Sequence, residues 1–343
     1  MSKVEIKVQF ETITPLWTGD AWMENNEIRP SSLMGSLRFW FEVICYFGGV
    51  CSAKDFDKEK GRFEKDIKNE SIRKELLKQG TDFDGQISAL KDLKIPIPAI
   101  IFGTTGWKSL LEIKSIKNMT KMEKKYPFPI NKFEVKELKY TKNGKDIKPA
   151  WYFKKGFYGK FEVVFRIHNQ IRDSIFFPLL NFMDKYGYWG GGWNIGYGRL
   201  RINRVEIDKV EVSDWRKDEF DFSKVGKNEN IYIEGNDGQK NKLVEFITDK
   251  GALTSKDPKI KHWKHSECNL SVKDMLENLI IKKANLRRSL NDQKERHYIF
   301  GKTGNVPQED LPQGSKILPY INSNFECGLL SIAGILNLYQ GDN

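Results

Sequence analysis

The feature that most constrains the fold is a change of hydrophobic period within the first fifty residues. In residues 3–13, KVEIKVQFETI, apolar and polar side chains alternate, which is the period of a strand with one buried face. In residues 29–49, RPSSLMGSLRFWFEVICYFGG, apolar residues recur at helical spacing, and Ser31 or Ser32 can cap the helix start. The chain therefore begins with a strand and an amphipathic helix that ends at Gly48-Gly49.

Later segments extend this pattern and predict an α+β fold. Strand-like runs are IPAIIFG (97–103), SLLEIKSI (109–116), KFEVVFRI (160–167) and RLRINRVEI (199–207), and DSIFFPLLNFMDKYG (173–187) is typical of a short helix. Allowing for insertions, the order is the β-α-β-β-α-β of a ferredoxin-like (RRM-like) domain, with two helices on one face of an antiparallel sheet. The other face is left open, and RNA-recognition domains bind single strands there.

The remaining segments predict insertions and a second domain. Residues 52–94 are charged, with one helix expected around ESIRKELLKQ (70–79), and indicate a solvated insertion; a basic, proline-containing excursion covers 117–155. After about residue 211 come SVKDMLENLIIKKANLRRSL (271–290), HYIFGKTG (297–304) and SKILPYI (315–321). The repetition of IFGTTG (101–106) as IFGKTG (299–304) favours a duplication. We therefore expect two ferredoxin-like domains, 1–210 and a divergent 211–343.

The charge distribution indicates a polyanionic partner. The chain carries 57 Lys and Arg against 46 Asp and Glu, a net charge of +11. Residues 256–302 alone contain twelve basic and six acidic residues, so more than half of the net charge lies in this segment. Nucleic acid is the first partner to consider for such a patch. Its candidate RNA contacts are Arg287, Arg288, Arg296 and Lys302.

No membrane segment is expected. The first residues, MSKVEIKVQFETI, lack the apolar core of a signal peptide, and no apolar run approaches the ~18 residues that a membrane span requires. The sequence therefore predicts a cytoplasmic location without membrane contact.

The start of the first helix is a candidate phosphate site. A helix N-terminus offers unpaired N–H groups and partial positive charge. Ser31 and Ser32 add hydroxyl groups, Arg29 precedes the helix, and Arg38 flanks its apolar stripe. Gly35 lies on the polar face, where a missing side chain lets a ligand approach closely. The alternative is a capped helix with two surface arginines.

The second candidate is the loop GGGWNIGYGRL (190–200), which has five glycines within nine positions. It lacks the G-x-x-x-x-G-K-[ST] pattern of a P-loop, and a strand rather than a helix follows, unlike a dinucleotide fingerprint. The N–H groups of the loop glycines can lie against a phosphate backbone, with Trp193 or Tyr197 packing or stacking. The alternative is a tight connection with positive φ at the glycines and the aromatic rings in the core. The candidate contacts are Gly190, Gly191, Gly192, Trp193, Gly196, Tyr197 and Gly198.

The sequence predicts neither a metal site nor a cofactor. His262, His265 and Cys268 have a spacing compatible with metal ligands, but no fourth ligand stands nearby. Asp20 is a solitary carboxylate in the loop before the first helix, which is weak support for metal-assisted hydrolysis. His168 is expected at a strand end, and His297 lies among basic residues.

Taken together, TPLWTGD, RPSSLMGSLRFWFEV, IFGTTG with SLLEI, and GGGWNIGYGRL resemble the RAMP superfamily of CRISPR-associated proteins. More narrowly, they resemble the first-numbered RAMP subunit of the Cmr (type III-B) effector complex, over residues 14–200 and again at HYIFGKTG. The resemblance implies a glycine-rich loop, residues 190–198, that lies against guide RNA or a neighbouring subunit. It also implies partners: guide RNA, target RNA and other RAMP subunits.

Two functions follow from this resemblance. The first is a non-catalytic RNA-binding subunit that contacts the 3′ part of the guide RNA, the target RNA or both. The second is a metal-independent endoribonuclease of the RAMP type that matures guide RNA, usually with a histidine as general base. No histidine precedes His168, which favours the binding subunit and predicts that the chain is not an enzyme.

Overall fold

The computed structural model describes residues 3–19, 24–47, 50–129, 131–135, 140–142, 145–147, 150–216, 271–289, 296–297, 300–301, 315 and 317–331. Its helices are α1 (Pro30–Phe47), α2 (Asn69–Gln79), α3 (Phe83–Asp92), α4 (Ile97–Phe102), α5 (Phe177–Lys185) and α8 (Val272–Ser289). Short helical turns are η1 (Ala53–Asp55), η2 (Asn169–Ile171), η3 (Arg172–Phe176), η4 (Trp193–Ile195) and η5 (Asp214–Arg216).

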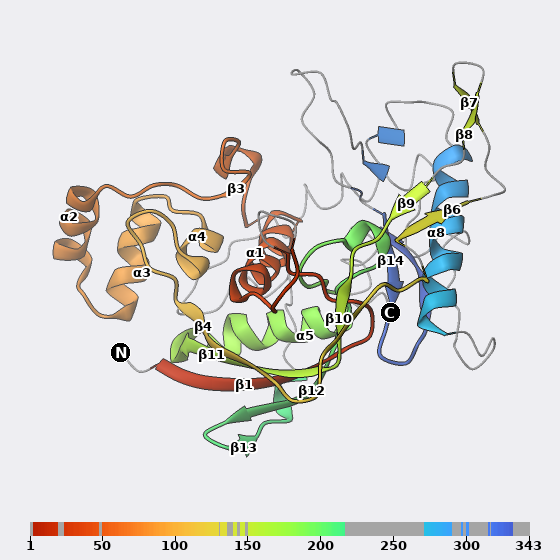
Figure 1. Ribbon diagram of the computed structural model, residues 1–343. Coiled ribbons are helices and arrows are strands. Elements are labelled where there is room, and N and C mark those ends of the chain that lie inside the picture. The colour runs from red at the N-terminus through yellow and green to blue at the C-terminus, as the bar shows by residue number, and fades with distance from the viewer. Residues whose placement is uncertain are drawn as a thin grey trace, which may run out of the picture.

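The central element is a five-stranded sheet made of β1 (Lys3–Thr12), β4 (Leu111–Asn118), β11 (Lys160–His168), β12 (Leu200–Ile207) and β13 (Val210–Glu211). Its spatial order is β13-β12-β1-β11-β4, and every neighbouring pair is antiparallel. The first strand of the chain thus lies between the third and fourth long strands, and the two helices α1 and α5 interrupt the strands where the sequence predicts. The fold is mixed α/β with an antiparallel sheet (Figure 1).

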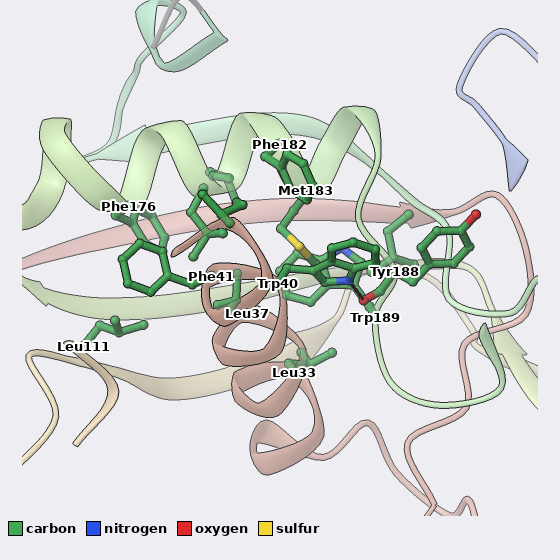
Figure 2. Packing of buried hydrophobic residues seen from close by; sticks show 14 of the residues in the cluster. Leu33, Leu37, Trp40, Phe41, Leu111, Phe176, Phe182, Met183, Tyr188 and Trp189 are labelled. Carbon is green, nitrogen blue, oxygen red and sulfur yellow. Dashed lines mark hydrogen bonds between the residues drawn. The ribbon is translucent and has the colours of Figure 1, made fainter. Parts of the chain in front are cut away.

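The core lies between this sheet and the helices α1 and α5. Ile6, Val8 and Phe10 of β1 are fully buried, and their partners across β11 are buried too. Figure 2 shows the apolar side chains of α1 meeting those of α5, with the Trp40 ring centroid 5.5 Å from that of Phe182. The alternation in β1 and the helical stripe in α1 therefore bury their apolar faces against each other, as their periods predict.

One expected strand is a helix. Residues 97–102 of the run IPAIIFG form α4, with Pro96 at its N-cap and Pro98 in its first turn. Proline is favoured in the first turn of a helix, whereas it removes a hydrogen bond from a central strand. The strand prediction was wrong because a short, wholly apolar run has no period that separates a buried helix from a buried strand.

The charged insertion is more buried than its composition indicates. The expected helix around residues 70–79 is confirmed as α2, but α3 follows it and buries Phe83, Ile87 and Leu90 in the main core. Two short strands, β2 (Phe56–Asp57) and β3 (Arg62–Phe63), precede them as a hairpin. In Figure 1, α2, α3 and α4 lie together on one side of α1.

The described residues of the basic excursion between β4 and β11 form three small antiparallel ribbons. They pair β5 (Glu123–Lys125) with β10 (Gly156–Tyr158), β6 (Lys132–Glu134) with β9 (Ala150–Tyr152), and β7 (Tyr140–Lys142) with β8 (Lys145–Ile147). The β5–β10 ribbon joins the rest of the molecule through a bridge between Leu16 and Phe157, whose N–H groups each donate to the other's carbonyl at 3.0 and 2.8 Å.

The described residues after 216 pack directly on the first part of the chain. They contain α8 and a hairpin of β14 (Ile317–Ile321) and β15 (Cys327–Ser331), and β14 contacts η4 of the glycine-rich loop. Figure 1 shows α8 and β14 beside each other at the end of the sheet opposite α2. Within the described residues, this helix and hairpin do not make up a β-α-β-β-α-β unit, so a second ferredoxin-like domain stays a prediction.

Candidate nucleic-acid interface

The glycine-rich loop (residues 190–198) packs against α1 and against the segment that follows β1. The Gly190 N–H donates to Ser36 Oγ of α1 at 2.8 Å, and the Gly191 N–H donates to the Trp17 carbonyl at 2.8 Å. The Gly198 N–H donates to the Pro15 carbonyl at 2.9 Å. These three N–H groups therefore form hydrogen bonds within the protein. The bonds fix the loop to α1 and to the segment after β1.

The backbone of the loop has the conformation of a tight connection. Gly190, Gly192, Gly196 and Gly198 have φ between 69° and 85°. The Gly192 carbonyl accepts the N–H groups of Ile195 and Tyr197 and closes the turn. Side chains other than glycine rarely adopt this φ, so the glycine content has a structural reason. An RNA contact by the loop stays a prediction.

The two aromatic residues of the loop differ in exposure. Tyr197 is buried, its hydroxyl donates to the Lys154 carbonyl at 2.7 Å, and burial raises its pKa above the usual range. Trp193 is half-buried, and its ring centroid lies 4.8 Å from that of Phe39 and 5.8 Å from that of Trp40. Phe39 is 38% exposed. Of the two loop aromatics, Trp193, beside Phe39, is the one that is partly exposed.

The start of α1 places two of the predicted contacts at the surface. Ser31 and Gly35 are exposed, and a Cβ added at Gly35 would find no atom within 4 Å. Ser32 is half-buried, and its hydroxyl donates to the Thr18 carbonyl at 3.4 Å. The backbone N–H of Arg29 donates to Thr18 Oγ1 at 3.2 Å. Thr18 thus ties the preceding loop to this helix end.

Arg38 lies in a network inside the protein. Its guanidinium donates to Glu42 at 2.8 Å and to Glu64 at 3.1 Å, and also to the carbonyls of Phe63 and Gly103. Burial raises the pKa of Glu42 although Arg38 opposes it. A phosphate at Arg38 would compete with these carboxylates, so the predicted RNA contact would require the network to open.

Two of the predicted cations, Arg287 and Arg288, lie near the end of α8. Arg287 donates to the carbonyls of Phe300 and Gly301, and burial lowers its pKa, with the Arg296 charge as a smaller cause. Arg288 is exposed and Arg296 is half-buried. Lys302 lies outside the described residues. The structure adds Lys283, one turn before Arg287.

Lys283 connects α8 to the glycine-rich loop. Its Nζ donates to the carbonyl of Asn194 at 2.8 Å. Burial, and to a smaller extent the charge of Arg287, lowers the pKa of Lys283 to about 7. Since a buried ammonium needs acceptors, this hydrogen bond offsets part of the desolvation of the charge.

The open face of the sheet offers no stacking platform. The outward side chains of β1 are Glu5, Lys7, Gln9 and Glu11, and those of β11 are Lys160, Glu162, Val164 and Arg166. Lys114 of β4 contacts Glu5 at 2.5 Å and Arg201 of β12 contacts Glu11 at 2.7 Å. RNA-recognition domains stack bases on aromatic residues of these strands. Both strands lack such residues, so the outward face of β1 and β11 does not offer this mode of stacking.

The candidate metal ligands of the sequence lie outside the described residues. His262, His265, Cys268 and Asp20 are outside the described residues, and among the described ones no group of three or more His, Cys, Asp or Glu could hold a metal ion. His168 ends β11, as expected, and is buried with its ring stacked on Phe83. Within the same residues, no helix is long and apolar enough to cross a membrane.

Sequence reasoning did not single out the lysines of residues 117–160 as ligands of RNA. This segment contains thirteen lysines and four carboxylates, a net charge of +9, which exceeds the +6 of residues 256–302. A charge count over the excursion would have found it. In the structure, Lys154 of this segment contacts Tyr197 of the glycine-rich loop through its carbonyl and Trp17 through its ammonium group.

Solved structures resemble the chain along almost its whole length at low identity. Cmr1 from Pyrococcus furiosus in its apo form is 16% identical, with 95% of this chain and 86% of that chain covered and a TM-score of 0.39. A chain of the Type III-B Cmr-beta bound to cognate target RNA is 12% identical, with coverages of 99% and 100% and a TM-score of 0.45. A chain of the Type III-B Cmr-beta bound to cognate target RNA and AMPPnP, in the presence of ssDNA, is 11% identical. The match covers 98% of each chain and has a TM-score of 0.39. All TM-scores lie below 0.5, so these likenesses assign no family.

No curated protein matches the chain. The family model of the RAMP superfamily matches residues 9–201. This range runs from β1 to the start of β12 and includes α1, α5 and the glycine-rich loop. Since the match extends over more than half of the 343 residues, the chain belongs to the RAMP superfamily.

Proposed function

We propose that this RAMP protein is a non-catalytic, RNA-binding subunit of a CRISPR type III-B (Cmr) effector complex. It contacts the 3′ part of the guide RNA, the target RNA or both, beside other RAMP subunits. Membership of the superfamily and the order of the motifs from TPLWTGD to GGGWNIGYGRL support this proposal.

The observation that carries the proposal is the gathering of basic segments around the glycine-rich loop. The hydroxyl of Tyr197 in the loop donates a hydrogen bond to the carbonyl of Lys154. The ammonium of Lys283 in α8 donates one to the carbonyl of Asn194 in the loop. The loop therefore contacts both basic segments, residues 117–160 at Lys154 and residues 256–302 at Lys283. A polyanion that follows this surface meets cations from both.

The histidines support a binding role over cleavage. Metal-independent cleavage of RNA needs a group that removes the proton of a 2′-OH. No histidine precedes His168, which is 5% exposed and whose Nδ1 lies 2.6 Å from Gln170 Oε1. The endoribonuclease alternative would therefore depend on a histidine in the second half of the chain, such as His297.

The test is a titration of the purified chain with two single-stranded RNAs of unrelated sequence. We expect similar affinities for both and a log–log salt slope of about −2 to −4, since about three to five neutralised phosphates contribute roughly −0.7 each. The same RNAs should stay intact with Mg²⁺, with Mn²⁺ and with EDTA. A slope near zero would contradict the binding role, and site-specific products lost in His297→Ala would support the endoribonuclease instead.

A further inference from the structure

Three lysines lie over three aromatic rings at the β5–β10 ribbon. Lys154 Nζ is 4.3 Å from the ring centroid of Trp17, Lys125 Nζ is 5.1 Å from that of Tyr158, and Lys155 Nζ is 5.4 Å from that of Tyr126. Ammonium groups at these distances are attracted by the negative face of the ring. The rings therefore hold the flexible lysine side chains near one ribbon.

Two buried side chains form hydrogen bonds with the backbone carbonyls of Lys154 and Lys155. The Tyr197 hydroxyl donates to the Lys154 carbonyl at 2.7 Å, and the Asn25 side-chain amide donates to the Lys155 carbonyl at 3.1 Å. Asn25 is itself buried, and its Oδ1 accepts the Thr18 N–H at 2.9 Å. Two buried side chains thus determine where the Lys154-Lys155 pair lies, which reduces the entropy lost on binding.

The glycine-rich loop also sets the position of Trp17. A Cβ on Gly191 would lie 2.7 Å from Trp17 Cε3, so the ring fits only against a glycine. The ring has Gly191 close to it and the Lys154 ammonium over its face. The loop therefore positions both the aromatic ring and, through Tyr197, the backbone of the lysine that covers it.

The chemistry of the ribbon fits a phosphodiester backbone better than a protein. An ammonium over a ring still has N–H groups that can donate to phosphate oxygens. The ribbon strands carry one carboxylate, Glu123, which contacts Lys125 at 2.6 Å. Phe157, the phenylalanine of the ribbon strands, is buried and adds no exposed apolar side chain to this surface. Tyr152 on the adjacent β9 is 68% exposed and can stack on an unpaired base.

We propose that the β5–β10 ribbon with Trp17 is the surface that holds the backbone of single-stranded RNA, with Lys154 and Lys155 contacting phosphates. Tyr197 is a positioning residue, and the glycine-rich loop acts on RNA through this ribbon. This inference rests on the proposed RNA-binding function and assigns the residues that perform it.

The test compares two pairs of lysines in the full-length chain. Lys154→Gln/Lys155→Gln removes two charges from the ribbon, and Lys68→Gln/Lys74→Gln removes two exposed charges at α2, which Figure 1 shows well apart from β10. At about 0.1 M salt we expect the ribbon variant to lose roughly 10- to 30-fold in affinity and its salt slope to become shallower by about 1.4, the loss of about two phosphate contacts. The α2 variant should bind like the wild type.

The arginine variant Lys154→Arg/Lys155→Arg shows whether a loss of affinity comes from the lost charge or from a disturbed fold. It keeps both cations and the contacts with the rings, so it should bind within a few-fold of the wild type. If Lys154→Gln/Lys155→Gln lowers the thermal midpoint of unfolding, the RNA titration is repeated with Lys155→Gln alone, because Lys155 is exposed. Equal losses in the ribbon and α2 variants, or unchanged binding in the ribbon variant, would overturn the ribbon assignment while the binding function stands. No binding by the wild type would instead refute the binding function.

Discussion

Arg199 is a single residue that connects two parts of the molecule, the end of α5 and the C-terminal hairpin. It is fully buried, and its guanidinium donates to carbonyl groups at and just after the end of α5 and to the Ile321 carbonyl in β14 at 3.0 Å. The rings of Tyr188 and Tyr320 lie 5.4 and 5.0 Å from its central carbon. A cation is favoured at the C-terminus of a helix, where unpaired carbonyls carry partial negative charge. Arg199 thus fastens the C-terminal hairpin to α5.

Replacing Arg199 with Met should destabilise the protein severely. The change leaves several buried carbonyls without donors, and we expect about 3–5 kcal/mol of lost unfolding free energy, since each such group costs about 1–3 kcal/mol. The matched control is Arg204→Met on β12, which begins just after Arg199; Arg204 is exposed and paired with Glu206, and its replacement should cost less than about 1 kcal/mol. Urea unfolding measures both variants. Similar losses at the two positions would show that the carbonyls do not depend on Arg199.

At the scale of elements, α1 and the glycine-rich loop each contain a glycine that can be replaced by alanine. We expect the replacement to raise stability in α1 and to lower it in the loop. Gly35 has open space around it, so Gly35→Ala should stabilise by about 0.5–1 kcal/mol through the helix propensity of alanine. Gly196 has φ of 84°, and a Cβ there would lie 2.7 Å from Leu276 Cδ2, so Gly196→Ala should destabilise by about 1–3 kcal/mol. Thermal unfolding of the two variants gives the signs, and equal signs would contradict this geometry.

The elements differ in how far the sequence predicts them, for a physical reason in each case. The strand β1 and the helix α1 have clear periods, and both are confirmed near their expected bounds. The run Ile97–Phe102 has no period, so only the prolines favoured a helix. The contact between Tyr197 and Lys154 joins residues 43 positions apart and leaves no local pattern. Sequence reasoning therefore found the glycine-rich loop but not the lysines that it positions.

At the scale of the whole molecule, the described C-terminal segments share the core of the first part. Leu276 of α8 and Ile317 of β14 are fully buried in the same hydrophobic cluster as Phe10 of β1. The Tyr188 hydroxyl donates to the Pro319 carbonyl at 2.8 Å and adds a polar connection. Shared burial of this kind couples the stability of the two parts, whereas separate domains unfold independently.

The substitution Leu276→Ala tests this coupling. Leu276 is fully buried, and truncation should cost about 2–5 kcal/mol of unfolding free energy through lost burial and a new cavity. Leu77→Ala on α2 is the control, because Leu77 is 89% exposed and its loss should change stability by less than about 0.5 kcal/mol. Calorimetry and near-ultraviolet circular dichroism should show the transition of the buried Trp40 and Trp189 region moving to lower temperature in the Leu276 variant. If instead a separate early transition appears and that region unfolds as before, α8 and the hairpin form an independent unit, and this result would support the two-domain organisation expected from the sequence.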